Sequence, residues 1–321
     1  MTRLFTEGFE MGDNLAFDIT TPTLTAVSVR SGNYAARNTG VISIASKTEL
    51  YVRVGLYSSN TSGLYDHRVY FYEDSDLILH FRRIYPYIHA YVDGVKVADG
   101  TLNIPTSQWF LFECHVKLAD SGGVLQTKIN GIPDIDYTGD TNPSTYSGFN
   151  RVGFKAEVVS YYDDIAINDT NGSEDNSWCG DGHIIAIKPN ANGDQSDLTN
   201  SGGDSVNNYT YVDDIPSDGD STYVWSDTAT DFDLYNLTAP SLPVNHRITR
   251  IYAEARAKDP DTGDIKLIIK PDSTVYKDSA ATTLTTSYSA IKGDEYTENP
   301  DDGNAWEESD LDDLQAGVEI Q

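Results

Sequence analysis

Cysteine, methionine, basic residues and long hydrophobic runs are all scarce in this chain of 321 residues. Its two cysteines, Cys114 and Cys179, are too few for a disulfide scaffold and match no metal-binding spacing, so we expect free thiols. Fifty acidic residues face 22 basic ones, and the formal net charge is −28. Because phosphate backbones and anionic membranes are bound through Lys and Arg, this deficit argues against a nucleic-acid partner and against docking on a membrane surface.

Signals for membranes and export are also missing. No run reaches the roughly 18 apolar residues of a membrane-spanning helix, so we expect no membrane insertion. The first residues contain no apolar segment of signal-peptide length and reach an acid at Glu7. We therefore expect synthesis in a cytoplasm.

Short alternating runs rich in Val, Ile, Tyr and Phe fill most of the chain. Leu50, Val52 and Val54, for example, alternate with Tyr51 and Arg53. This period of two, broken by Gly, Asn, Asp and Pro, predicts an all-β protein. The pairs at 93–94 (Asp-Gly) and 130–131 (Asn-Gly) predict tight hairpin turns, and 309–315 is the best helix candidate.

A polar stretch at 168–177, which contains no apolar residue, divides the chain. It predicts two β-sandwich domains in tandem, residues 1–175 and 176–321. The first part has 13 basic and 22 acidic residues (13 − 22 = −9), and the second has 9 and 28 (9 − 28 = −19). The second domain is therefore the more acidic one.

Motifs for catalysis are absent from the sequence. No Gly-x-Ser-x-Gly, His-Glu-x-x-His or phosphate-binding loop occurs, and no strand carries the Glu-x-Asp-x-x-Glu pattern that places two carboxylates on one face of a sandwich hydrolase. We therefore expect no enzymatic activity and no required cofactor. A glycoside hydrolase or lyase whose carboxylates come from distant strands is the weakest alternative.

One predicted surface combines tyrosine with Arg and His. If the aliphatic residues of the first-domain strands point inward, the opposite side carries these residues together. Flat aromatic rings stack on sugars, and Tyr and Arg are also enriched in protein interfaces. Glycan binding, contact with another protein, and cover by the protein's own loops all remain open for the set Tyr51, Arg53, Tyr70, Tyr72, His80, Arg82, Tyr87, His89 and Tyr91.

Several segments suggest a family. LFTEGFE at 4–10, SGNYA at 31–35, WFLFECHV at 109–116 and YYDDIAIND at 161–169 occur in this order. With them, residues 1 to about 170 resemble the concanavalin A-like lectin and laminin-G jelly roll. Together with NSWCGDG at 176–182 and NPDDGNAW at 299–306, the whole chain is similar to virion proteins of tailed bacteriophages.

The resemblance implies a non-enzymatic virion structural protein, displayed on the head, tail or fibre and made in the host cytoplasm. The second domain would then serve assembly or display. It implies other virion proteins as partners and a homo-oligomer such as a trimer. A carbohydrate-binding adhesin module is the alternative function.

Related jelly rolls often hold a cation that ties the first strand to the last. Carboxylate oxygens are the ligands that Ca²⁺ prefers. The resemblance therefore implies a structural calcium site formed by Glu7, Glu10, Asp163 and Asp164.

Overall fold

The computed structural model of the protein describes residues 3–59, 67–157, 159–240, 242 and 246–321. The chain divides into two compact units, and the boundary in the sequence falls between Ile185 and Ala186. This boundary lies ten residues (185 − 175) beyond the predicted one. The difference arises because residues 177–184 hydrogen-bond to strands of the first unit, as described below.

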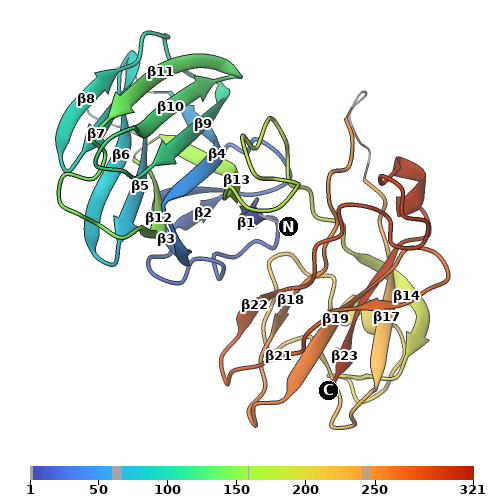
Figure 1. Ribbon diagram of the computed structural model, residues 1–321. Coiled ribbons are helices and arrows are strands. Elements are labelled where there is room, and N and C mark those ends of the chain that lie inside the picture. The colour runs from blue at the N-terminus through green and yellow to red at the C-terminus, as the bar shows by residue number, and fades with distance from the viewer. Residues whose placement is uncertain (1–2, 60–66, 158, 241, 243–245) are drawn as a thin grey trace. The chain divides into compact units, whose positions relative to one another are not determined.

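The first unit consists of two antiparallel sheets that share one long strand (Figure 1). Sheet A contains β1 (Arg3–Glu7), β2 (Thr23–Thr25), β4 (Glu49–Ser58), β9 (Trp109–Lys117), β10 (Gly123–Ile129), β11 (Ile132–Gly139) and β13 (Ser160–Asn168). Sheet B contains β5 (His67–Glu73), β6 (Asp76–Ile84), β7 (Tyr87–Val92), β8 (Val95–Asp99) and β12 (Phe149–Ala156). The shared strand is β3 (Ala35–Lys47).

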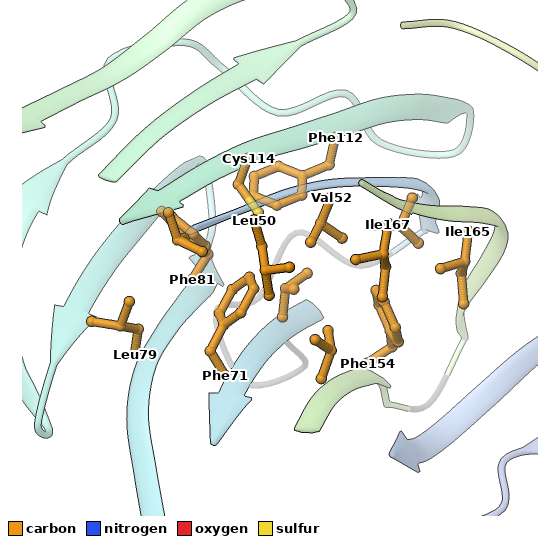
Figure 2. Close-up of a cluster of buried hydrophobic side chains, with 14 of the residues drawn as sticks. Leu50, Val52, Phe71, Leu79, Phe81, Phe112, Cys114, Phe154, Ile165 and Ile167 are labelled. Atoms are coloured by element: carbon orange, nitrogen blue, oxygen red, sulfur yellow. The ribbon is translucent and has the colours of Figure 1, made fainter. Parts of the chain in front are cut away.

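The core lies between these two sheets (Figure 2). From sheet A, Val52, Phe112 and Cys114 point inward, and from sheet B, Phe71 and Phe81 meet them. Burying one such side chain stabilises the fold by about 2 kcal/mol. The alternation predicted from the sequence is therefore confirmed, and the first unit is an antiparallel β-sandwich.

Both predicted hairpin turns are present. Asp93 and Gly94 join β7 to β8, and Asn130 and Gly131 join β10 to β11. All four residues have positive φ, as a type I′ turn requires.

The second unit is built on a six-stranded antiparallel sheet. It contains β14 (Pro189–Ser196), β17 (Phe232–Leu237), β19 (Asp264–Lys270), β20 (Tyr276–Lys277), β21 (Thr282–Thr283) and β23 (Gln315–Ile320). Two further strand pairs are β15 (Thr199–Asn200) with β16 (Val224–Trp225) and β18 (Glu254–Ala257) with β22 (Ser289–Lys292). Ile265, Leu267 and Ile291 form a small core between the β18–β22 pair and this sheet. The all-β class is confirmed.

The helix predicted at 309–315 is wrong. The described residues include two short 3₁₀ turns, η1 (Asn208–Tyr211) and η2 (Glu308–Leu311), and Gln315 already begins β23. The side chains of Glu307 and Asp310 form a capping box at η2, but Leu311 and Leu314 are then drawn into a core around Trp306. Tertiary packing outweighs the weak local helix preference here.

Across the described ranges, no helix is long and apolar enough to cross a membrane. Cys114 is buried and Cys179 is partly buried, and both are free thiols, as predicted.

Candidate functional site

The predicted Tyr, Arg and His surface is divided between the two sheets. Tyr51 and Arg53 lie on β4, on the outer side of sheet A. The other predicted residues lie together on the outer side of sheet B, on β5, β6 and β7: Tyr70, Tyr72, His80, Arg82, Tyr87, His89 and Tyr91. The prediction that all nine residues share one surface is therefore wrong for Tyr51 and Arg53. Alternation gives the direction of each side chain, but it does not show which sheet a strand joins.

Three rings form a row across sheet B. Tyr70 pairs with His80, and His80 pairs with Tyr91, on adjacent strands. The His80 and Tyr91 rings are stacked, with centroids 4.4 Å apart and planes 4° from parallel, and Tyr70 lies 6.0 Å from His80. Gly153 continues the row on β12. We call Tyr70, His80 and Tyr91 the aromatic row.

The glycine in this position has a packing reason. A Cβ atom at Gly153 would lie 3.2 Å from Cε2 of Tyr72 and 3.4 Å from Cβ of Tyr70. The Tyr72 ring lies beside Tyr70, 5.8 Å between centroids, and burial raises the pKa of Tyr72 to about 12. Its hydroxyl therefore stays protonated at neutral pH and able to donate a hydrogen bond.

A second row, parallel to the first, is basic. Lys155 pairs with Arg68, Arg68 with Arg82, and Arg82 with His89, across four neighbouring strands. We call Lys155, Arg68, Arg82 and His89 the basic row. His89 and Lys96 both contact Asp99, Lys155 contacts Glu157, and the Arg68 guanidinium lies 6.0 Å from the centre of the Tyr70 ring.

Sequence reasoning missed two members of the basic row. Arg68 precedes Tyr70 by two positions on the same strand, so the alternation that selected Tyr70 could have found it. Lys155 could not be found in this way, because it lies far away in sequence on β12 and reaches the surface only through the pairing of β12 with β5.

Tyr51 and Arg53 are covered by the chain itself. The Tyr51 ring stacks on His115, 4.2 Å between centroids, and contacts Trp178 edge-on. Arg53 is 6% exposed and donates from Nε to the carbonyl oxygen of Asp164, 3.1 Å away, and from Nη1 to that of Gly180. For these two residues, cover by a segment of the protein is what the structure shows.

Three of the four carboxylates predicted to bind calcium, those of Glu10, Asp163 and Asp164, lie close enough to interact electrostatically. Glu7 is on β1, which pairs with β13, and Asp163 and Asp164 are fully buried on β13. A register shift after Asp163 and a positive φ at Asp164 mark a bulge, which turns the Asp164 side chain toward Arg30. Glu10 is also buried.

The chain itself already supplies hydrogen bonds to the oxygen atoms of both aspartates. Asp164 accepts from Nη1 of Arg30 (2.6 Å), Oγ of Ser31 (2.7 Å) and the amide of Ile184 (2.8 Å). Asp163 accepts from the amides of Arg30 (2.9 Å) and Asp164 (2.8 Å). The Arg30 guanidinium thus lies where a cation would be needed, and this donor set does not fit calcium, which takes six to eight oxygen ligands.

No other metal site takes its place in the described part of the chain, where no group of three or more His, Cys, Asp or Glu side chains is arranged to hold an ion. Burial raises the pKa of Glu10 to about 7 and raises the pKa of Asp163 well above its usual range. Asp164 behaves oppositely: its hydrogen bonds to His183 and Ser31 and the charge of Arg30 outweigh burial and lower its pKa.

The surface of sheet B offers several groups that can bind a ligand. The aromatic row offers the partly exposed rings of His80 and Tyr91, because Tyr70 is only 6% exposed. The basic row offers cations in a chain of net charge −28. Two acids at the edge of this surface are held in ion pairs, Asp99 by His89 and Lys96, and Glu157 by Lys155.

Comparisons with known proteins found no matching family model and no matching curated sequence. Among solved structures, the carbohydrate-binding module CBM66 from Bacillus subtilis is 11% identical, with a TM-score of 0.33, over 46% of this chain and 92% of its own. Sheep galectin-11 is 12% identical, with a TM-score of 0.30, over 40% of this chain and 97% of its own. A sialidase is 11% identical, with a TM-score of 0.36, over 47% of this chain and only 16% of its own length.

Proposed function

We propose that the first unit binds carbohydrate on the outer surface of sheet B, and that its ligand is an acidic polysaccharide. The observation that carries this proposal is the pair of parallel rows, one aromatic and one basic, on β5, β6 and β7. A pyranose ring packs against the partly exposed, stacked pair of His80 and Tyr91, and its carboxylate or sulfate group reaches the basic row.

The negative charge proposed for the ligand is based on the local basic row and not on the net charge of the protein. A surface with Arg68, Arg82 and Lys155 in register stands out in a molecule with more than twice as many acids as bases. Arg presents its donors in a planar fork that matches carboxylate and sulfate groups. A neutral glycan would use the rings but not this row.

Binding to an array of acidic and neutral polysaccharides, followed by calorimetric titration with the bound ones, tests the proposal. Tyr91→Ala should weaken binding about tenfold, since it removes one partner of the stacked pair. Arg82→Gln should weaken binding and reduce its dependence on salt. The matched controls are Tyr223→Ala, an exposed tyrosine of the second unit, and Lys117→Gln, an exposed cation of sheet A.

Absence of binding to every acidic polysaccharide, or binding that Tyr91→Ala and Arg82→Gln leave unchanged, would contradict the proposal. We also propose that binding occurs without cleavage, because Asp99 and Glu157 are held in ion pairs at the edge of the surface. Release of reducing ends or unsaturated sugars from the bound polysaccharide would overturn this part.

The place of action is proposed from the sequence resemblance alone: the exterior of a tailed-phage particle, in a homo-oligomer such as a trimer, with other virion proteins as partners. The acidic second unit suits such a role, since a strongly negative surface is repelled by packaged nucleic acid. Mass spectrometry of purified particles tests the location, and light scattering of the purified protein tests the oligomer. A chain absent from mature particles, or monomeric in solution, would reject the corresponding part.

A further inference from the structure

A pocket of about 540 Å³ lies on the outer side of sheet A, away from the surface described above. Residues of β9 and β10 and the hairpin turn at Asn130 and Gly131 form one part of its lining. Arg30 and residues of the 178–181 segment form the rest. Its volume is within the range of small-molecule sites, roughly 300 to 1,000 Å³.

Two tryptophans line this pocket, Trp109 and Trp178. The Trp109 ring packs against Tyr57, 5.6 Å between centroids, and Trp178 is held edge-on by His115 at 6.1 Å. Nζ of Lys128 lies 3.8 Å from the centre of the Trp178 ring. Contacts with Tyr57 and His115 therefore hold the two indoles in place in the free protein.

The charged side chains of the pocket balance one another. Arg30 and Lys128 face Glu113 and Asp181 in the lining. Arg30 forms an ion pair with Asp181, and Glu113, 3% exposed, accepts a hydrogen bond of 2.8 Å from the amide of Gly180. An anionic ligand would be repelled by the two carboxylates, and a cationic ligand would be repelled by the two basic side chains.

We propose that this pocket binds a neutral sugar, one or two residues in length. The Trp109 ring and the hydrogen-bonding groups of both signs beside it suit a hydroxylated pyranose, which is apolar on its face and polar at its rim, while the Trp178 ring, with Lys128 on one face, forms the wall beside it. An organic cation is disfavoured, because Lys128 already lies over the Trp178 ring. An anion is disfavoured by Glu113 and Asp181.

The pocket and the sheet B surface belong to opposite outer faces of the same sandwich. The first unit would therefore carry two separate sites, one for an acidic polysaccharide and one for a neutral sugar. Two sites that engage one polymer, or neighbouring polymers, raise the overall affinity through effective concentration. This inference stands on the pocket alone and holds or fails independently of the sheet B site.

Nuclear magnetic resonance of the four indole N–H groups tests the inference on the unmodified protein. The signals are assigned by single Trp→Phe variants, and the probes are methyl glycosides of glucose, galactose, mannose and N-acetylglucosamine, with glucuronic acid as the anionic comparison. We expect at least one neutral glycoside to shift the signals of Trp109 and Trp178 saturably, with a Kd of about 10 mM or tighter. Trp225 and Trp306, both in the second unit, should not shift.

Signals of Trp109 and Trp178 that no neutral glycoside shifts would overturn the inference, as would equal shifts of all four signals or a preference for glucuronic acid. A second measurement uses Trp109→Ala, which should weaken binding of the active glycoside at least about tenfold. The control is Trp225→Ala, an exposed tryptophan whose loss should leave affinity unchanged. Unchanged affinity in Trp109→Ala would also overturn it, and the indole titration decides alone where that variant does not fold.

Discussion

At the scale of single residues, Glu10, Asp163, Asp164 and Arg30 form a buried cluster of charged groups. Three of the four are carboxylic acids with little exposure, and one oxygen of Glu10, Oε1, meets no hydrogen-bond donor among the described residues. The Arg30 guanidinium balances Asp164 but not all three acids. Proton binding by Glu10 and Asp163 therefore relieves the cluster.

The pH dependence of stability should show this. Because the pKa of Glu10 rises from 4.5 to about 7 on folding, the folded state holds more protons than the unfolded state between these values. The free energy of unfolding therefore falls as pH rises through this window. Urea unfolding at about pH 5 and pH 8 should show a fall that is about 2 kcal/mol smaller in Glu10→Gln than in the wild type. Equal falls in both proteins would contradict the burial of an ionisable Glu10.

Arg30 lies in a loop, but we expect its side chain to contribute substantially to the free energy of unfolding. Its side chain donates to Asp164 and to the carbonyl oxygen of Gly182, 2.8 Å away, and it crosses β4 at Gly55. Arg30→Ala leaves Asp164 without its cation and should lower the free energy of unfolding by about 3 kcal/mol.

Gly55→Ala provides an independent check on the same contact. The new Cβ atom would lie 2.3 Å from Cδ of Arg30, so Arg30 would have to move. Chemical denaturation at neutral pH measures both variants. Losses below about 0.5 kcal/mol in both would show that the Arg30 contact does not stabilise the fold.

At the scale of elements, period two and turn residues predicted most of the first unit. The alternation of β4 and the two turns needed only local information, because side-chain direction and positive φ are set within a few residues. To predict which residues share a surface, the pairing of the strands must also be known. Tyr51 and Tyr70 have the same local pattern, yet β4 pairs with β9 and β13, whereas β5 pairs with β6 and β12.

The segment after β13 shows the same limit. Residues 168–177 are polar, but Trp178 and Cys179 follow them directly and pack the chain against sheet A. An apolar pair after a polar stretch was a signal for packing. Which sheet it would cover, and that a pocket would form beside it, depended on strand pairing that the sequence does not reveal.

The turn between β7 and β8 permits a clean test of the backbone argument. Gly94 has a φ of +75°, and a Cβ atom added there would meet nothing within 4 Å. Gly94→Ala should therefore cost about 1 kcal/mol, from the left-handed backbone alone. Thermal unfolding should find this loss, with the exposed neighbour Val95→Ala as a control within about 0.5 kcal/mol of the wild type. A neutral Gly94→Ala would contradict the type I′ turn.

At the scale of the whole molecule, the chain consists of two compact units, and the 177–184 segment belongs to the first. It supplies the amide of Ile184 to Asp164 and the amide of Gly180 to Glu113. A fragment that ends at residue 185 should therefore fold and unfold cooperatively. A fragment that ends at residue 175 should be less stable by several kcal/mol, because Asp164 and Glu113 lose these donors.

Circular dichroism during urea unfolding of the two fragments measures the difference. Equal stability would contradict the assignment of the segment to the first unit. The fragment that ends at 185 also keeps both candidate sites, so it should bind as the full chain does.

The central claim is that the paired aromatic and basic rows of sheet B form a glycan site. A crystal structure of the protein with an acidic oligosaccharide that it binds on the array tests this most directly. The account predicts a sugar ring in contact with the His80 and Tyr91 pair, with its acidic group within hydrogen-bond distance of Arg82 or Arg68. An oligosaccharide bound elsewhere on the molecule, with the rings of β5, β6 and β7 untouched, would contradict it.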